Sequence, residues 1–419
     1  MSWQRSLEQR AAFLSRTVLV LFLASWCLWF WPFDDWLDRR GTPLGADFTM
    51  FYVSGWVARE APPAELYDQG QHQAQLHAMF PQLNASFCLP FRYPPWVALL
   101  MAPLSCCPYP LAYAAFFAAS CAAWLVTLDW LGRKLELLPA RAWWWALAGW
   151  PVACETLIGG QASMAAAWIV VATLWLLKRN CPVAAGTVLA CAAYKPNVLA
   201  LFGLGVAIRY PRVLWGLAGM AGALITATVV LGGSEALREY CQLAARLSGE
   251  TWEVETPAWK VHSLTSWVAC AVPGHARLLT LVLGMLVCAA VGIAWRRRVA
   301  GEQTDDLAAG GLLVLNALFN PYTPIYDLVL LGPAAMLLAR GAGPYVAVRS
   351  DSPGWAGAVA HGAFAGLFFG PHLSQALAQR FSIQLFPLVL LGAAVCLTCP
   401  LVYRSTRTSV CGIGGALSR

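Results

Sequence analysis

The sequence predicts an all-α protein that crosses a membrane many times, and two observations predict this fold class. Of the 419 residues, 59% are hydrophobic and only 12% are charged, whereas soluble domains carry roughly 25% charged residues. The apolar residues also form long blocks, such as residues 13–33, 278–295, 356–370 and 384–403. Because about 20 apolar residues can cross a bilayer as a helix, we expect about 10–12 transmembrane segments in a single membrane domain. This domain is expected to cover residues 1–404.

The basic residues predict the orientation, because Lys and Arg mark the cytoplasmic ends of membrane segments. Arg5, Arg10 and Arg16 precede the first apolar block, and no small-residue cleavage site follows it. That block is therefore expected to remain as an uncleaved first span. The arginines at 296–298 mark another cytoplasmic end, and those in residues 405–419 predict a cytoplasmic tail. We expect an inner or plasma membrane protein with both termini in the cytoplasm.

Two polar stretches are expected on the non-cytoplasmic side: an outer loop at residues 34–92 and a second one at residues 233–262. The first is acidic and rich in aromatic residues. Within it, residues 48–59 place four aromatic side chains near one face of a helix: Phe48, Phe51, Tyr52 and Trp56. This pattern predicts an amphipathic helix that lies at the membrane surface.

The topology of residues 93–208 has two alternatives. If the basic residues at 133, 134, 141, 178 and 179 are all cytoplasmic, the block at 94–108 only dips into the membrane, and residues 183–208 form a hairpin with Lys195-Pro196 at its tip. If those residues are outside, both blocks are full crossings. The distribution of positive charge favours the first alternative.

Asp47 is the first candidate for a chemical role, because it stands just past the first span and directly before the predicted helix. A carboxylate there would lie at the membrane surface against apolar side chains. It could take a proton from an attacking hydroxyl group as a general base. The alternative is structural, since Asp is a favoured N-cap residue before a helical run. Both roles can coexist.

Lys195 lies in the segment LACAAYKPNVLALF, with apolar residues on both sides. An ionisable residue inside a membrane segment is costly and marks a functional site by default, and an ammonium group can bind a lipid phosphate. The alternative is a side chain that reaches the interface from a helix end. Arg92, at the border of the outer loop, is a second candidate for the phosphate, or else an interfacial anchor. Tyr93 beside it is a candidate for lining the cavity.

Three further residues are candidates for substrate binding or for lining a cavity. Gln161 follows a Gly pair at the start of an apolar segment, where exposed N–H groups can hold an anion or a sugar hydroxyl. His262 ends the second polar stretch, although a lone His is more often a satisfied core side chain. Asp327 is an acid in an apolar setting, where it would pair with a cation or line the cavity.

The sequence also argues against several classes of site. The net charge of +7 comes from basic residues scattered beside apolar segments, so nucleic acid is not an expected partner. No CxxC pair with metal spacing occurs among the 14 cysteines, and neither a P-loop nor an HExxH motif is present. We therefore expect no metal and no cofactor.

The order of the short motifs resembles that of a known family. A GADF segment in the outer loop is followed by YPPWVALLMAPLS, by GGQ at the start of a span, by AAYKPNVLALF, by a late HSL and by NPYTPIYDLVLL. This series, over residues 47–331, resembles glycosyltransferase family 87, the polyprenyl-phosphate-mannose-dependent mannosyltransferases of the GT-C fold class. Two departures concern specificity: Ala162-Ser163 follows the Gly-Gln, and His262 stands where many members have Gln.

The resemblance implies an inverting transfer of a hexose, mannose in the family, from a polyprenyl-phosphate donor to a hydroxyl of a glycolipid or glycan. It implies a catalytic acid in the first outer loop, where Asp47 is the matching position, and it matches the family's Lys-Pro to Lys195-Pro196. Membrane lipids are the expected surroundings, with the active site on the outer face. The rival function is a transporter or lipid flippase, which also uses broken helices and intramembrane charges.

Overall fold

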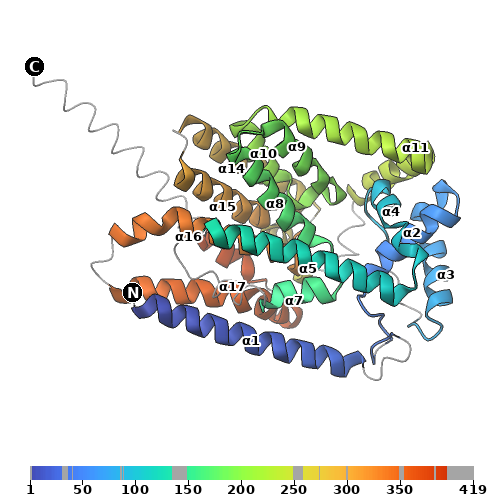
Figure 1. The fold of residues 1–419 in the computed structure, drawn as a ribbon, viewed down its shortest axis with the longest axis horizontal. Helices are drawn as coiled ribbons and strands as arrows, with labels where there is room; N and C mark the ends of the chain where they lie inside the picture. Colours follow the sequence, from blue (N-terminus) through green and yellow to red (C-terminus); the bar gives the residue numbers. More distant parts are fainter. Residues whose placement is uncertain are drawn as a thin grey trace, which may run out of the picture. The chain divides into compact units, whose positions relative to one another are not determined.

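The computed structural model describes residues 2–30, 36–39, 41–84, 87, 89–134, 149–248, 258–272, 274–298, 301–348, 353–381 and 384–393. Over these residues the chain forms helices and connecting turns, and an isolated bridge between Leu37 and Pro43 is the one extended pairing found there. Figure 1 shows the helices in chain order. The predicted all-α class is confirmed, while the expected tail at 405–419 lies outside the described residues.

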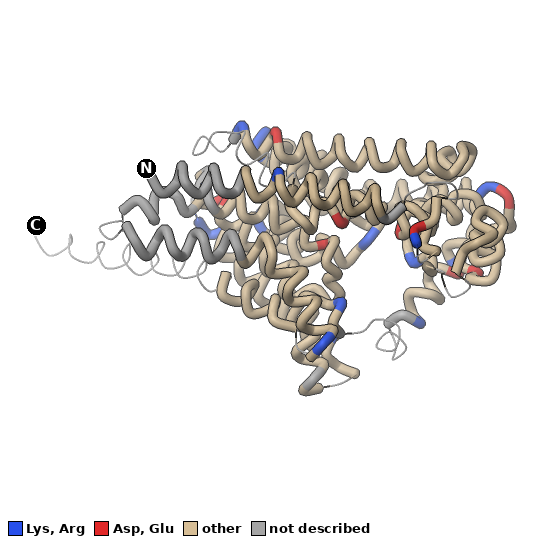
Figure 2. The backbone as a smooth tube through the Cα atoms, turned by 90° about the horizontal axis from the view of Figure 1, so that it is seen from below, with Lys and Arg blue, Asp and Glu red and all other residues tan. Residues whose placement is uncertain are grey.

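The membrane character is visible in the helices themselves. Among the described residues, three helices are long and apolar enough to cross a membrane: α5 (Tyr109–Lys134), α11 (Val213–Ser248) and α14 (Ala276–Arg297). In addition, α7 (Pro151–Ile158) and α8 (Ser163–Lys178) pass the same test as a pair that is bent by 117°. Figure 2 shows the long helices as stretches with few charged residues. A multi-pass membrane protein is confirmed, whereas about 10–12 crossings stay a prediction.

The chain divides into two compact units, each described by itself. The first comprises Met1–Leu199, Tyr210–Pro257 and Pro324–Val329, and the second comprises Ala200–Arg209, Ala258–Thr323 and Leu330–Arg419. The expectation that residues 1–404 make up one catalytic domain stays a prediction.

The first unit contains, besides α5, α7, α8 and α11, the long helix α1 (Ser2–Phe30) and a set of short helices: α2 (Phe48–Glu60), η1 (Pro63–Tyr67), α3 (Gln69–Met79), α4 (Pro95–Met101), η2 (Leu104–Cys106), α9 (Pro182–Ala190), η3 (Cys191–Tyr194) and η4 (Pro196–Val198). The predicted helix after Asp47 is confirmed as α2. It is more deeply covered than an interfacial helix would be, since all its residues from Phe48 to Gly55 are buried. Its aromatic side chains pack on α5, with the rings of Phe48 and Phe116 4.9 Å apart.

Close backbone contact joins α9 to α11. A Cβ atom added at Gly186 would lie 2.0 Å from the carbonyl oxygen of Val213, and one added at Gly216 would lie 1.9 Å from that of Val183. Only glycine fits at either position. Small residues that let helix backbones touch are the usual packing device in membranes, where lipid removes the hydrophobic driving force.

The expected second loop at residues 233–262 is partly helical. Helix α11 continues to Ser248 after a break at Gly233, whose φ of 77° lies outside the helical region. Residues 249–257 of that stretch lie outside the described residues.

The second unit contains α10 (Ala200–Arg209), η5 (Ala258–Lys260), α13 (Thr265–Ala271), α14, α15 (Glu302–Phe319), α16 (Leu331–Val348) and α17 (Pro353–Phe381). The side-chain oxygen of Asn316 in α15 accepts the backbone N–H groups of Leu201 and Phe202, both at 3.2 Å. A polar residue in the middle of an apolar helix thereby satisfies the first turn of α10, whose donors have no partner within that helix.

The block at 94–108 contains a short helix, and the two topological alternatives for residues 93–208 stay predictions. Helix α4 has 7 residues, so it is about 10 Å long and too short to cross. The hydroxyl of Tyr109, which opens α5, donates to the carbonyl of Leu44, three residues before Asp47. The block therefore returns to the region of the Asp47 turn.

Candidate functional site

The Asp47 turn is held against the Gly-Gln turn that separates α7 from α8. The backbone N–H of Asp47 donates to the carbonyl of Gly159 at 2.9 Å. Gly160 has a φ of +74°, and a Cβ atom there would lie 2.6 Å from Cβ of Phe48. Glycine is therefore required, both for the left-handed conformation and for the close approach. The GGQ motif brings the break in the α7–α8 pair next to Asp47.

Asp47 occupies the N-cap position of α2 without performing the capping function. It directly precedes Phe48, but its side chain makes no capping hydrogen bond. The residue is half-buried, and Oδ2 points along the Gly-Gln turn, where a Cβ atom on Gly159 would be 3.8 Å away. Asp47 therefore stands at the N-cap position but does not cap the helix with its side chain. Its carboxylate lies beside the N-terminus of α2, which favours negative charge.

Lys195 and Asp327 form a buried ion pair. The ammonium Nζ lies 2.5 Å from Oδ2 of Asp327, and the two residues are 8% and 2% exposed. The other carboxylate oxygen, Oδ1, accepts the hydroxyl of Ser163 at 2.7 Å, at the start of α8. The Lys-Pro sequence explains the position of Lys195, since a residue before Pro avoids helical backbone and here joins η3 to η4 with φ of −139°.

Aromatic side chains surround this ion pair. The ammonium of Lys195 lies 4.5 Å from the centroid of the Tyr326 ring. The rings of Tyr93 and Tyr194 stack with centroids 6.3 Å apart, and the Tyr194 hydroxyl donates to the carbonyl of Ala162 at 3.0 Å. Tyr93 also reaches the amide oxygen of Gln161, at 3.5 Å. The result is an apolar wall with a few fixed polar groups, as substrate sites commonly have.

Five of the predicted site residues therefore lie around one helix break in the first unit: Asp47, Tyr93, Gln161, Lys195 and Asp327. Asp47 reaches this break through the Gly159 carbonyl, and Lys195 reaches it through Asp327 and Ser163. A buried cation can hold an anionic group, and a carboxylate at the same helix break can serve as a base.

The two remaining predicted residues are Arg92 and His262. Arg92 is half-buried directly before Tyr93, and its role toward a phosphate stays a prediction. His262 belongs to the second unit, where its backbone N–H donates to Thr323 at 2.9 Å and its Nε2 lies 3.3 Å from the carbonyl of Pro371. It is fully buried with its ring edge toward Phe386, a packing typical of a core histidine.

Sequence reasoning missed Ser163, Tyr194 and Tyr326. Ser163 was noted only as a departure from the family pattern, yet it binds Asp327 across 164 positions of sequence. Tyr194 directly precedes Lys195, and Tyr326 directly precedes Asp327. An aromatic residue next to each intramembrane charge was therefore the sequence feature that could have indicated these two tyrosines. Within the part of the chain that the structure describes, no group of three His, Cys, Asp or Glu side chains is placed to hold a metal ion.

The fold and the site define a multi-pass, all-α membrane protein with a charged cluster at a broken helix. The family model described as Glycosyltransferase family 87 matches residues 91–323, more than half of the chain, so the chain belongs to glycosyltransferase family 87 and is a membrane glycosyltransferase. This membership supports an enzyme over the rival transporter or flippase. The matched range includes Tyr93, Gln161 and Lys195 but neither Asp47 nor Asp327. No curated protein and no solved structure matched the chain.

Proposed function

We propose that the protein transfers a hexose, with mannose as the family resemblance suggests, from a polyprenyl-phosphate donor to an acceptor hydroxyl on the non-cytoplasmic side of the membrane. The observation that carries this proposal is the position of Asp47 against the Gly-Gln turn, which leads into Ser163 and through it to the buried Lys195–Asp327 pair. Such a transfer needs two groups: a base for the acceptor hydroxyl and a cation that binds the donor phosphate.

In the proposed reaction the acceptor oxygen attacks the anomeric carbon from the side opposite the phosphate. The bond between that carbon and the phosphate oxygen breaks, and the electron pair leaves with the phosphate. Asp47 takes the proton of the acceptor hydroxyl as the new bond forms. A β-linked donor then gives an α-linked product. The phosphate is a good leaving group, so one carboxylate suffices.

Lys195 is proposed to bind the donor phosphate while it stays paired with Asp327. Burying a lone ammonium at membrane depth would be costly, and Asp327 offsets that cost before the donor arrives. The hydrogen bond from Ser163 holds the Asp327 carboxylate in place, and the carboxylate orients the Lys195 ammonium. The N–H groups at the start of α8 lie in the same place and favour an anion.

The helix directions support the proposed sidedness. Helices α5 and α8 pack side by side (Figure 1), and each has its first residues near the Asp47 turn. Each ends in basic residues at its far end, at Arg133-Lys134 and at Lys178-Arg179. Since Lys and Arg mark the cytoplasmic ends of spans, Asp47 is expected on the outer face.

Replacement of Asp47 tests the proposal most simply. The Asp47→Asn variant should lower transfer from radiolabelled polyprenyl-phosphate hexose to membrane-extract acceptors by about 10²–10⁴-fold, the usual contribution of a general base. The matched control is Glu60→Gln, which removes a carboxylate at the other end of α2, where Glu60 is exposed and paired with Arg59. Transfer at the wild-type rate by a folded Asp47→Asn variant would refute the proposed role.

A further inference from the structure

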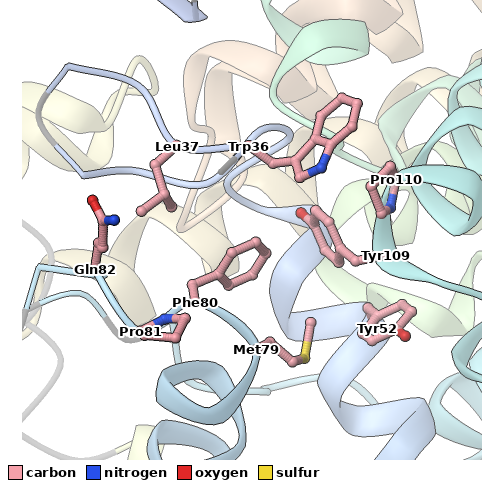
Figure 3. Close-up of a pocket in the computed structure, with 9 residues that line it drawn as sticks. All are labelled: Trp36, Leu37, Tyr52, Met79, Phe80, Pro81, Gln82, Tyr109 and Pro110. Carbon is pink, nitrogen blue, oxygen red and sulfur yellow. The ribbon is translucent and has the colours of Figure 1, made fainter. Parts of the chain in front are cut away.

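A pocket lies in the first unit, and none of the residues of the charged cluster lines it. It has a volume of about 450 Å³, within the range of small-molecule sites, and is lined by Trp36, Leu37, Tyr52, Met79, Phe80, Pro81, Gln82, Tyr109 and Pro110. Figure 3 shows the Phe80 ring in the middle, with Leu37 and Gln82 to one side of it and Trp36, Tyr109 and Tyr52 to the other. Nothing in the mechanism above uses this pocket.

The pocket combines aromatic faces with a few polar groups. Its rings come from Trp36, Tyr52, Phe80 and Tyr109, and the lining side chains also carry the Gln82 amide and the Trp36 indole N–H. The hydroxyls of the two tyrosines donate to the carbonyls of Cys107 and Leu44. A pyranose ring has the matching character, because its C–H faces are apolar and its hydroxyl groups point outward around the rim. Tyr and Trp side chains suit such ligands, because one side chain offers an aromatic face to the C–H groups and a polar atom to the hydroxyl groups.

Trp36 is held in an unusual backbone conformation. Its φ is +60°, in the left-handed region that bulky residues rarely adopt, and its side chain is 37% exposed. The turn is fixed by a hydrogen bond from the Leu44 N–H to the Trp36 carbonyl and by one from the Thr42 N–H to the Asp38 side chain, both at 2.8 Å. A strained residue that its surroundings hold in place is a common feature of ligand sites.

The pocket shares one residue, Tyr109, with the packing around the Asp47 turn. Tyr109 lines the pocket, and its hydroxyl donates to the Leu44 carbonyl in the turn that leads to Asp47. The Tyr109 ring also lies 5.6 Å from that of Phe48, the residue after Asp47. A molecule in this pocket therefore contacts the tyrosine that also packs on the Asp47 turn.

We propose that this pocket binds a sugar ring of the acceptor, so that the hydroxyl to be glycosylated points toward Asp47. The proposal rests on the proposed function, because only a transferase needs an acceptor beside its base. A C–H face of the sugar stacks on Trp36 or Phe80, and the Gln82 amide and the indole N–H donate to its hydroxyl groups. The polar groups at both ends of the pocket favour a saccharide over an acyl chain.

The test uses the full chain in lipid nanodiscs and a methyl α-hexopyranoside that carries a diazirine, without glycoside detergents. After photolysis, mass spectrometry should find the label at residues 36–37 or 79–82, and unlabelled methyl hexopyranosides should compete for it. Trp36→Ala should reduce labelling about tenfold, the loss expected for one aromatic platform. Trp36→Phe keeps a ring and should retain most of it. The control Trp215→Ala removes a tryptophan of α11 that is 75% exposed, and labelling should not change.

The outcomes separate this proposal from the proposed function. Asp47→Asn should be labelled as the wild type is, because binding in the pocket does not need the base. If that variant keeps its transfer activity, the proposed function fails while the labelling result stands by itself. Labelling that is absent, that lies elsewhere or that Trp36→Ala leaves unchanged would overturn the acceptor site. Competition by an alkyl-chain probe but not by hexosides would overturn it as well.

Discussion

Lys195 and Asp327 illustrate how two residues that are individually unfavourable in a membrane become acceptable together. Each is almost completely buried, and their charged atoms are 2.5 Å apart. Removing one partner leaves the other as an uncompensated buried charge, whereas replacing both by apolar side chains does not. Single and double substitutions of the pair can therefore separate its contribution to stability from its role in phosphate binding.

We expect Lys195→Met alone to lower the free energy of unfolding by about 3–5 kcal/mol, the usual cost of breaking a buried pair. The double variant Lys195→Met/Asp327→Leu should recover much of that loss, because no charge is left unpaired. Transfer should be lost in both, since neither offers a cation to the phosphate. Unfolding in lipid and transfer assays on the same preparations measure the two effects. Additive losses of stability, or transfer by the double variant, would contradict this account.

The element that organises the site is the break between α7 and α8. Its turn contacts the Asp47 turn through Gly160 and continues into Ser163, which binds Asp327. A membrane helix can be broken in this way only where protein groups satisfy the freed backbone. Here the Gly159 carbonyl does so by accepting the N–H of Asp47.

The Gly160→Ala substitution is expected to displace the Asp47 turn, because the added Cβ would meet Phe48 and the φ of +74° disfavours alanine. We expect a loss of about 1–3 kcal/mol in stability, and a fall in transfer of about 10²-fold if the turn moves by about 1 Å. Thermal unfolding and transfer rates measure both. The control is Gly222→Ala in α11, where a Cβ atom meets nothing within 4 Å. Equal behaviour of the two variants would argue against the tight turn.

At this scale the sequence was informative about local features and uninformative about distant pairings. The apolar run after Asp47 predicted α2, and Lys195-Pro196 predicted a helix break, because both signals are local. The burial of α2 was not predictable, since it depends on aromatic side chains of α5 that follow some 60 positions later in the sequence. The Ser163–Asp327 contact was missed for the same reason, because no periodicity reports it.

For the whole molecule, composition predicted the membrane fold because a chain with 12% charged residues cannot cover itself with polar side chains. Composition did not predict the division into two units, which assigns His262 and the Lys195 region to different bodies. The chain passes from one unit to the other several times; for example, α10 of the second unit follows η4 of the first in the sequence. The role predicted for His262 therefore stays a prediction.

The orientation of the chain can be tested with two exposed native cysteines, Cys106 and Cys181. Cys106 contacts Arg59 at the end of α2, whereas Cys181 follows the basic end of α8. Single-cysteine variants of the protein would be expressed in cells and treated with a membrane-impermeant maleimide. In intact cells the reagent should label Cys106, and it should label Cys181 only after the cells are permeabilised. This follows if the basic end of α8 is cytoplasmic. The reverse pattern would place the proposed site on the cytoplasmic face.

The most direct test of the central claim is a structure of the protein with a non-hydrolysable polyprenyl-phosphonate hexose. The account predicts a phosphonate oxygen within about 3 Å of Nζ of Lys195. The anomeric carbon should face the side from which a hydroxyl bound to Asp47 would attack. A phosphonate bound away from Lys195, or a sugar that no acceptor hydroxyl near Asp47 can reach, would contradict the proposed mechanism.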